Sequence, residues 1–468
     1  MDLLLILRLV VLFGVIFMGI RLGGMAIGYT GGLGVIVLTV FLGMKAGAIP
    51  TDVILIIMSV IAAITALQKA GGLDYMVRIA ERILRNNPKH INFLAPTVTY
   101  VLTVLAGTGH TAFAMIPVIV EVAKEQDIKP AGPLSMAVVS GQVAITASPV
   151  SAAVVYMTGV LEPYGWSYPA LLIVWLLTTY VGCMIAAFIM STFFNKGKLS
   201  EDPIYRDRVE AGLTAPVGVK ERASLPETAK SSVIIFLTGV LFVVLYATFI
   251  SDVIRVPFTQ YLQANVDNGG SVISAALLSV LEPLKLARDG AIMSFMLLIA
   301  TFIVLKCKIN TGELADTPTF KSGMTACICV LGVAWLGNTF VAGYSEQLQE
   351  FSKAIISEYP GVLSVVLFFI SALLYSQAAT AKALIPVVIV ALGIDANPDL
   401  AYILVASFAA VSGLFILPTY PTLLGAVQMD DTGSTRIGKY IFNHSMLLPC
   451  ILCIFISVGL GFVIAPML

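Results

Sequence analysis

Uninterrupted apolar stretches long enough to cross a membrane constrain this chain more than any other feature. They lie at 3–20, 51–68, 169–194, 231–250 and 441–464. About 20 apolar residues cross a hydrocarbon layer of ~30 Å as a helix. A backbone in lipid must satisfy its own hydrogen bonds, so only helices or a closed barrel span it. Because these runs are continuously apolar and do not alternate, they predict an all-α polytopic membrane protein that lies in a lipid bilayer.

The amino-acid composition is also typical of a membrane protein. Only 12% of the 468 residues are charged, whereas a typical soluble domain has about 25%. The formal net charge is zero, so nothing indicates a nucleic-acid partner. Cys327 and Cys329, and likewise Cys450 and Cys453, are spaced like metal ligands, but no second ligand pair accompanies them. We therefore expect no metal and no cofactor.

The remaining segments divide the chain into two halves. Residues 195–230 are rich in charges and prolines and predict a cytoplasmic linker between a first half, 1–194, and a second half, 231–468. Further spanning helices are expected near 25–43, 288–305 and 323–342. The stretch 251–270 is polar, and 271–284 is ambiguous, with a surface helix as one interpretation. Four apolar segments are interrupted by Gly, Pro and short polar residues: 91–126, 131–160, 361–392 and 399–428.

The distribution of Lys and Arg orients this scheme. With the N-terminus outside, 20 basic residues fall in the inner loops and six in the outer ones. Basic residues concentrate on the cytoplasmic side, so the distribution favours both termini in the periplasm. This topology requires 91–126 and 361–392 each to enter the membrane and return on the same side. We therefore expect these two segments to form re-entrant helical hairpins.

A repeat relates the two halves. "TAFAMIPV" at 111–118 and "TAKALIPV" at 380–387 are identical at six of eight positions, at an offset of 269 residues. At the same offset Pro149 corresponds to Pro418, each within a polar break. Because the first copy enters from inside and the second from outside, the sequence predicts two inverted-topology repeats. Each has a re-entrant hairpin and a broken transmembrane helix, at 131–160 and 399–428.

Broken helices meet near the midplane in secondary transporters with inverted repeats, and their free N-termini suit a carboxylate. We therefore expect a substrate site where the hairpin tips "GTGHT" (107–111) and "SQAAT" (376–380) meet the breaks "SPVS" (148–151) and "LPTYPT" (417–422). The predicted substrate-binding residues are Thr108, Gly109, His110, Thr111, Ser148, Pro149, Ser151, Ser376, Gln377, Thr380, Lys382, Pro418, Thr419 and Tyr420.

Lys382 stands out because it lies in the apolar run "AATAKALIPVVI". Intramembrane ionisable residues usually face a cavity, and a lysine beside the second tip would balance an anion. The alternative is that Lys382 snorkels or pairs with a distant carboxylate. His110 is expected to bind a carboxylate or relay a proton, or else to hold the hairpin backbone. For Asp430 and Asp431 a cation site and a loop cap remain open.

At these residues the chain resembles the anaerobic C4-dicarboxylate transporter family, the Dcu type. The resemblance covers essentially the whole length and includes "AGTGHTAF", "ITASPVSAAVVYM", "GVAWLGNTF", "LLYSQAATAKALIPV" and "LFILPTYPTLLGAVQMDDTGSTRIGKYIFNH". The chain looks more like the A-type members than the B-type. The B-type has an acidic residue after its "TYPS", where this chain has Leu423. A B-type role as partner of a sensor kinase is therefore in doubt.

The resemblance implies a carrier in the bacterial inner membrane for fumarate, succinate, malate and aspartate. Exchange of these substrates or uptake coupled to a proton or sodium ion is implied as well. The family is similar to a wider superfamily of ion transporters, whose members are usually homodimers and work as elevators. By that analogy the hairpins and broken helices would form the moving part.

Other functions fit the residues less well. An anion channel would need a continuous polar pore, which occluding hairpins argue against. An enzyme would need catalytic material that the chain lacks, because there is no Gly-x-Ser-x-Gly elbow, zinc-type histidine pair or cofactor glycine motif. A carrier for another organic anion remains open, since only the resemblance favours C4 diacids.

Overall fold

The structure is a computed structural model. It describes residues 3–22, 25–109, 111–195, 197–214, 224–269, 272–282, 284, 286–344, 346–347, 359, 361–440 and 442–468. This part of the chain is helical and contains no β-strand. Seven of its helical segments are long and apolar enough to span a membrane. The prediction of an all-α polytopic membrane protein is therefore confirmed.

The described residues of the first half and the linker form the following α-helices. They are α1 (Leu3–Leu22), α2 (Ala26–Ile36), α3 (Thr51–Lys69), α4 (Gly72–Asn86), α5 (Ile91–Ala106), α6 (Thr111–Glu125), α7 (Ala131–Ala144), α8 (Ala152–Leu161), α9 (Tyr168–Ile189) and, in the linker, α10 (Pro203–Glu210). A π-helical turn, Val37–Phe41, extends α2, and another, Met190–Phe194, extends α9.

The second half repeats this pattern of long and broken helices. Its helices are α11 (Ala229–Phe249), α12 (Asp252–Asp267), α13 (Val272–Leu281), α14 (Arg288–Cys307), α15 (Pro318–Cys329), α16 (Trp335–Gly343), α18 (Val362–Leu374), α19 (Gln377–Leu392), α20 (Tyr402–Ser407), α21 (Pro421–Met429) and α22 (Leu447–Ile464). A π-helical segment, Val330–Ala334, joins α15 to α16.

The structure differs from the sequence-based prediction in three places. Helix α4 was not expected, although its buried Met76, Ala80 and Leu84 recur every four residues as in an amphipathic helix. Most of the polar stretch 251–270 forms α12, which packs against α13 in the ambiguous segment. The last helix begins at Leu447 and not at 441, because the described residues of 430–446 form a loop whose start Asp430 organises.

Packing divides the molecule into two units that meet at the predicted breaks. Helices α1–α4, α11 and α14–α16 pack mainly on one another, and we call them the α3 unit. Helices α5–α9 and α18–α22 likewise pack mainly on one another, and we call them the α7 unit. The α7 unit contains both predicted hairpins and both predicted broken helices.

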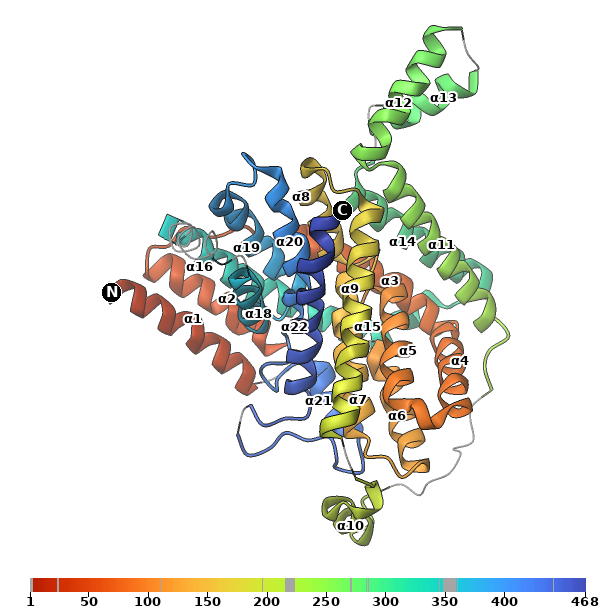
Figure 1. Ribbon diagram of the computed structural model, residues 1–468, viewed down its shortest axis with the longest axis vertical. Coiled ribbons are helices and arrows are strands. Elements are labelled where there is room, and N and C mark those ends of the chain that lie inside the picture. Colours follow the sequence, from red (N-terminus) through yellow and green to blue (C-terminus); the bar gives the residue numbers. More distant parts are fainter. Residues whose placement is uncertain are drawn as a thin grey trace.

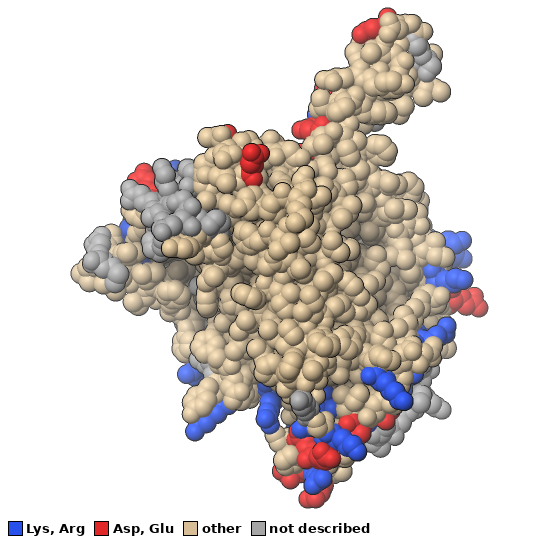
Figure 2. Space-filling view, viewed as in Figure 1, with Lys and Arg blue, Asp and Glu red and all other residues tan. Residues whose placement is uncertain are grey.

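The two ends of the molecule differ. The α12–α13 hairpin projects from one end, where the C-terminus also lies, and α10 lies at the opposite end (Figure 1). On the face shown in Figure 2, Lys and Arg side chains gather at the α10 end and along the adjoining flank, while the broad middle is almost free of charge. An uncharged middle between charged margins is what a lipid bilayer requires.

Candidate functional site

Both predicted hairpin tips are closed by a left-handed residue. Gly107 ends α5 with φ 72° and donates its N–H to Thr103 O, and Tyr375 ends α18 with φ 54° and donates to Ser371 O. Glycine adopts this conformation freely. For a bulky tyrosine it is an outlier, of the kind that persists only where surrounding packing imposes it, often at a functional site.

The first predicted break lies between α7 and α8. The backbone is extended at Ser148 and at Ser151, and the Ser151 hydroxyl caps α8 by accepting from Val154 N at 3.2 Å. Ser148 Oγ donates to Val104 O at 2.7 Å. Tyr168 Oη donates to the carbonyl of Pro149 at 2.9 Å. These hydrogen bonds hold the break in place at the N-terminal end of α8.

The second break lies between α20 and α21. Helix α21 begins at Pro421, and α8 begins at Ala152, which is the position related to Pro421 by the repeat offset of 269. The ring of Tyr420 stacks on Tyr375, with centroids 6.0 Å apart. The hydroxyls of Tyr375 and Thr419 are hydrogen-bonded. The second tip is thus tied to the second break.

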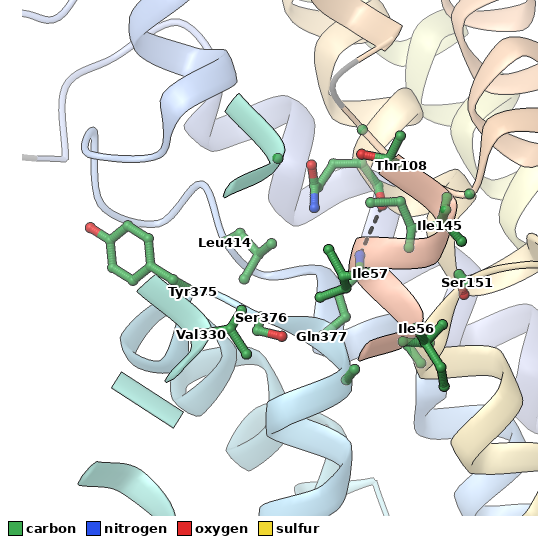
Figure 3. Close-up of a pocket in the computed structure, with 18 of the residues that line it drawn as sticks. Ile56, Ile57, Thr108, Ile145, Ser151, Val330, Tyr375, Ser376, Gln377 and Leu414 are labelled. Carbon is green, nitrogen blue, oxygen red and sulfur yellow. Dashed lines mark hydrogen bonds between the residues drawn. The ribbon is translucent and has the colours of Figure 1, made fainter. Parts of the chain in front are cut away.

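A cavity of about 120 Å³ lies where the tips and breaks meet the α3 unit. The α7 unit lines most of it, and α3 and α15 close the other side with residues such as Ile56 and Gly323 (Figure 3). Of the described lining residues none carries a charge. A water needs roughly 10–15 Å³ measured in this way, so the cavity has room for about ten waters or one small molecule.

Equivalent positions of the two repeats line this cavity. Six pairs separated by 269 residues do so: Gly107 and Ser376, Thr108 and Gln377, Gly109 and Ala378, Ile145 and Leu414, Ser151 and Tyr420, and Ala153 and Thr422. The repeat therefore has a structural counterpart at the cavity. Whether the repeats enter the membrane from opposite sides stays a prediction.

Two of the residues that line the cavity carry a buried polar atom without a hydrogen-bond partner. Gln377 Nε2 donates to the carbonyl of Gln142 and to Ser412 Oγ, both at 2.8 Å. Gln377 Oε1 and Thr422 Oγ1 are buried and have no hydrogen-bond partner, and both residues line the cavity. Gln142 Nε2 donates to Tyr420 Oη at 3.3 Å. Buried polar atoms normally have partners, so these two unpartnered oxygens distinguish Gln377 and Thr422 from the other lining residues.

The cavity contains some predicted site residues and not others. Those that line it are Thr108, Gly109, Ser151, Ser376, Gln377 and Tyr420. Those that do not are Thr111, Ser148, Pro149, Thr380, Lys382, Pro418 and Thr419. Of the second group, Thr111 Oγ1 is bonded to Thr103 Oγ1 at 2.8 Å, and Thr380 Oγ1 donates to Ser376 O at 2.7 Å. Both threonines therefore stabilise a hairpin tip through a hydrogen bond, although neither lines the cavity.

Lys382 lies beside the cavity and contacts Asp52, at the start of α3, in an ion pair. Its Nζ also lies 5.2 Å from the ring centroid of Tyr156. The sequence allowed for such a carboxylate partner but did not identify it. A role for Lys382 with substrate stays a prediction.

The remaining candidates from the sequence are His110, Asp430 and Asp431. His110 lies outside the described residues. Asp430 accepts from the backbone N–H groups of Thr432 and Thr435, which is the loop cap that the sequence allowed. Asp431 pairs with Lys124 at 2.9 Å. No group of three or more metal-ligating side chains occurs within the described ranges.

The lining residues that sequence reasoning missed include three with polar side chains: Gln142, Tyr375 and Thr422. Thr422 was quoted as part of the second break, and Tyr375 directly precedes the second tip, so proximity was an available signal for both. Gln142 lies inside a helix of otherwise small and apolar residues. A lone polar residue in such a helix was the signal for it.

Comparisons with known proteins agree with this architecture. A family profile described as anaerobic C4-dicarboxylate membrane transporter matches residues 4–468. The chain is 55% identical to the C4-dicarboxylate transporter DcuA of Helicobacter pylori over 98% of both chains. It is 50% identical to DcuA of Escherichia coli K12, covering 98% of this chain and 99% of that one. Identity to the anaerobic C4-dicarboxylate transporter DcuB of Escherichia coli O6:H1 is 34%, over 98% of both chains.

Spanning helices around a small uncharged cavity, together with these relatives, define a membrane transporter and not an enzyme. The chain belongs to the anaerobic C4-dicarboxylate membrane transporter family. Its higher identity to DcuA than to DcuB confirms the resemblance to the A-type. A solved structure of the Alcanivorax borkumensis YdaH transporter is 12% identical over 93% of this chain and 86% of that one, with a TM-score of 0.48, which is too low for any inference.

Proposed function

We propose that this protein carries C4-dicarboxylates across the bacterial inner membrane and binds them in the cavity between the α3 unit and the α7 unit. The substrates are fumarate, succinate, malate and aspartate, moved by exchange or by uptake coupled to a proton or sodium ion. The observation that carries the proposal is the uncharged cavity with two unpartnered buried oxygens, Gln377 Oε1 and Thr422 Oγ1, at the starts of α19 and α21.

Helix ends supply the charge that a dianion needs. Helices α8, α19 and α21 begin at or next to cavity-lining residues, and α6 begins two residues after the lining residue Gly109. A helix N-terminus acts as roughly half a positive charge, so four of them offer about two. An unbalanced charge in a low-dielectric site is very costly. The site therefore favours two carboxylates over one. A monocarboxylate would leave about half of the positive charge of the helix N-termini unbalanced.

The proposed binding residues follow from this arrangement. Thr108, Gly109, Ser151, Ser376, Gln377 and Tyr420 contact the substrate, together with Gln142 and Thr422. Lys382 provides charge from one helical turn away. Thr111, Ser148, Pro149, Thr380, Pro418 and Thr419 act indirectly by holding the tips and breaks in place. His110, at the first tip, is assigned to the site by sequence alone.

Alternating access follows an elevator scheme in this proposal. The α7 unit carries the substrate, and the α3 unit stays fixed and provides the contact between two copies in a homodimer. The separation of the packing into these two units, with the cavity at their boundary, supports it. The excess of Lys and Arg at the α10 end supports a cytoplasmic α10 and periplasmic termini (Figure 2).

Counterflow in proteoliposomes tests the function. Vesicles loaded with unlabelled succinate are given labelled fumarate or aspartate outside, with and without a pH or sodium gradient. We expect saturable accumulation of label that requires internal diacid. Flux that does not saturate and ignores the internal diacid would indicate an anion channel. No uptake of either label by folded protein would refute C4-dicarboxylate transport and leave another organic anion as the alternative.

A further inference from the structure

Three side chains from three helices form a cluster one helical turn from the cavity. They are Asp52 of α3, Tyr156 of α8 and Lys382 of α19, joined by the ion pair between Lys382 and Asp52 and the contact of Lys382 Nζ with the Tyr156 ring. We call it the charged closure. It joins the α3 unit, through Asp52, to the α7 unit.

The position of the charged closure follows from helix geometry. Residues four apart lie on the same face of a helix. Asp52 is four residues before Ile56, Tyr156 four after Ala152, and Lys382 four after Ala378, and these three residues line the cavity. All three side chains therefore cover the same side of the cavity.

That side faces the end of the molecule that carries the α12–α13 hairpin. Helix α8 runs from the cavity past Tyr156 to Leu161. Oε1 of the next residue, Glu162, accepts from the backbone N–H of Asp252, the first residue of α12, at 2.8 Å. The opposite side of the cavity has a different closure. By the offset of 269, Lys382 corresponds to Phe113 and Tyr156 to Gly425.

Phe113 and Gly425 are themselves in contact. A Cβ atom built on Gly425 would lie 2.2 Å from Phe113 Cε1, so the ring packs directly against the backbone of α21. Phe113 follows the lining residue Gly109 by four positions, and Gly425 follows Thr422 by three. The repeat thus places one contact on each side of the cavity. The contact of Phe113 with Gly425 is apolar, whereas the charged closure contains an ion pair.

We propose that Lys382 is a latch whose partner is exchanged. It holds Asp52 while the cavity is closed toward the α12–α13 end, and it transfers to a carboxylate of the incoming diacid when that side opens. Asp52 is then a gating residue that competes with substrate for the same ammonium group. This inference rests on the proposed function, since it needs a dicarboxylate as the competing anion.

The environment of the pair suits such an exchange. The Asp52 side chain is 47% exposed and that of Lys382 16%. Asp52 is therefore solvated when released, whereas Lys382 stays partly buried and needs another anion. Because one partner of this ion pair is exposed, the pair contributes less net stability than a fully buried one, so a substrate carboxylate can replace Asp52 at small cost. A buried pair would have resisted this exchange.

Four variants measured by succinate counterflow test the latch. Asp52→Asn removes the competitor, and we expect the KM for external succinate to fall by about three- to tenfold. Lys382→Gln removes the shared cation, and we expect the KM to rise more than tenfold. The double variant is expected to match Lys382→Gln, because Asp52 acts only through Lys382. The charge swap Asp52→Lys with Lys382→Asp re-forms the pair, yet the KM stays high.

An ion pair at the other end of α3 is the matched control. Lys69 Nζ lies 2.6 Å from Glu313 Oε2, both side chains are exposed, and Glu313 lies between α14 and α15 of the same α3 unit. Lys69→Gln and Glu313→Gln are expected to leave the KM unchanged. If either control lowers the KM as much as Asp52→Asn does, any change of charge at an end of α3 is enough to lower the KM. That result would overturn the latch.

The remaining outcomes separate the latch from the function itself. Suppose that Asp52→Asn raises the KM as Lys382→Gln does, and that the charge swap restores the wild-type KM. The ion pair is then only structural, and the latch is wrong. An unchanged KM in Asp52→Asn, with the wild type exchanging succinate, overturns the latch alone. A wild type that exchanges no C4 diacid overturns the proposed function and the latch together.

Discussion

Gln377 provides the most direct perturbation of the cavity. Its side chain is only 4% exposed and crosses from the second repeat to the first, donating to Gln142 O and Ser412 Oγ. Gln377→Met keeps the length and most of the volume of the side chain but removes both donors and the free Oε1. Each neutral hydrogen bond contributes ~1 kcal/mol net, so the loss is about 2 kcal/mol. If the site must be intact to bind, this corresponds to a roughly 30-fold weaker affinity.

The assay combines transport with ligand-dependent stability. We expect the KM for succinate in counterflow to rise about 30-fold. A ligand stabilises the state to which it binds by RT ln(1 + [L]/Kd). The same succinate concentration should therefore raise the Tm of Gln377→Met by less than it raises the Tm of the wild type in detergent.

The control removes a buried hydrogen bond away from the cavity. Ser364 Oγ donates to Ser407 Oγ at 3.0 Å, both residues are buried in the α7 unit, and neither lines the cavity. Ser364→Ala should lower the Tm by a few degrees and leave the succinate KM unchanged. The reasoning fails if Gln377→Met keeps the wild-type affinity, or if Ser364→Ala weakens succinate binding to the same extent.

Three further predictions concern the cavity and the linker. A Cβ at Gly109 would lie 2.5 Å from Gln142 Oε1, so Gly109→Ala should displace that amide and raise the succinate KM by about fivefold, the equivalent of one hydrogen bond. Thr422→Val removes a buried hydroxyl that has no protein partner; if substrate is its partner, the KM rises, whereas melting of the unliganded protein changes little or improves. Asp202 caps α10 and pairs with Lys129 at 2.9 Å. Partial burial raises the pKa of this carboxyl, but the Lys129 ammonium and the cap lower it further, so the net pKa is below its usual range. A lowered pKa gives stability that is present above the unfolded value of about 4 and lost as the pH falls through the folded value. Limited proteolysis of the linker should accordingly accelerate in that acid range, and Asp202→Asn should show the faster cleavage already at pH 7.

The fold class could be predicted because lipid leaves few alternatives. The apolar runs at 51–68 and 231–250 became α3 and α11 with bounds shifted by two residues or fewer. The repeat identified both tips and both breaks, because Gly and Pro interrupt a helix wherever it lies. Helix α12 was missed since its polar composition is also typical of a loop. Helix α4 was missed since its charged face masked the buried one.

The site was predicted only where the backbone itself gives the signal. Gly109, Ser151 and Gln377 lie at helix starts, and sequence alone marks such positions. Gln142 lies inside a helix and reaches the cavity only through the packing of α7 against both tips. Asp52 is 330 residues from Lys382, and no local pattern can pair side chains across that distance. Tertiary packing determines both contacts.

A structure of the protein in lipid nanodiscs with excess fumarate would test the central claim most directly. We predict density for one diacid between the starts of α8, α19 and α21, in contact with Gln377 and Thr422, and absent from a sample without fumarate. Fumarate density elsewhere, or an unchanged cavity in protein that exchanges fumarate, would contradict the assignment of this cavity as the transport site.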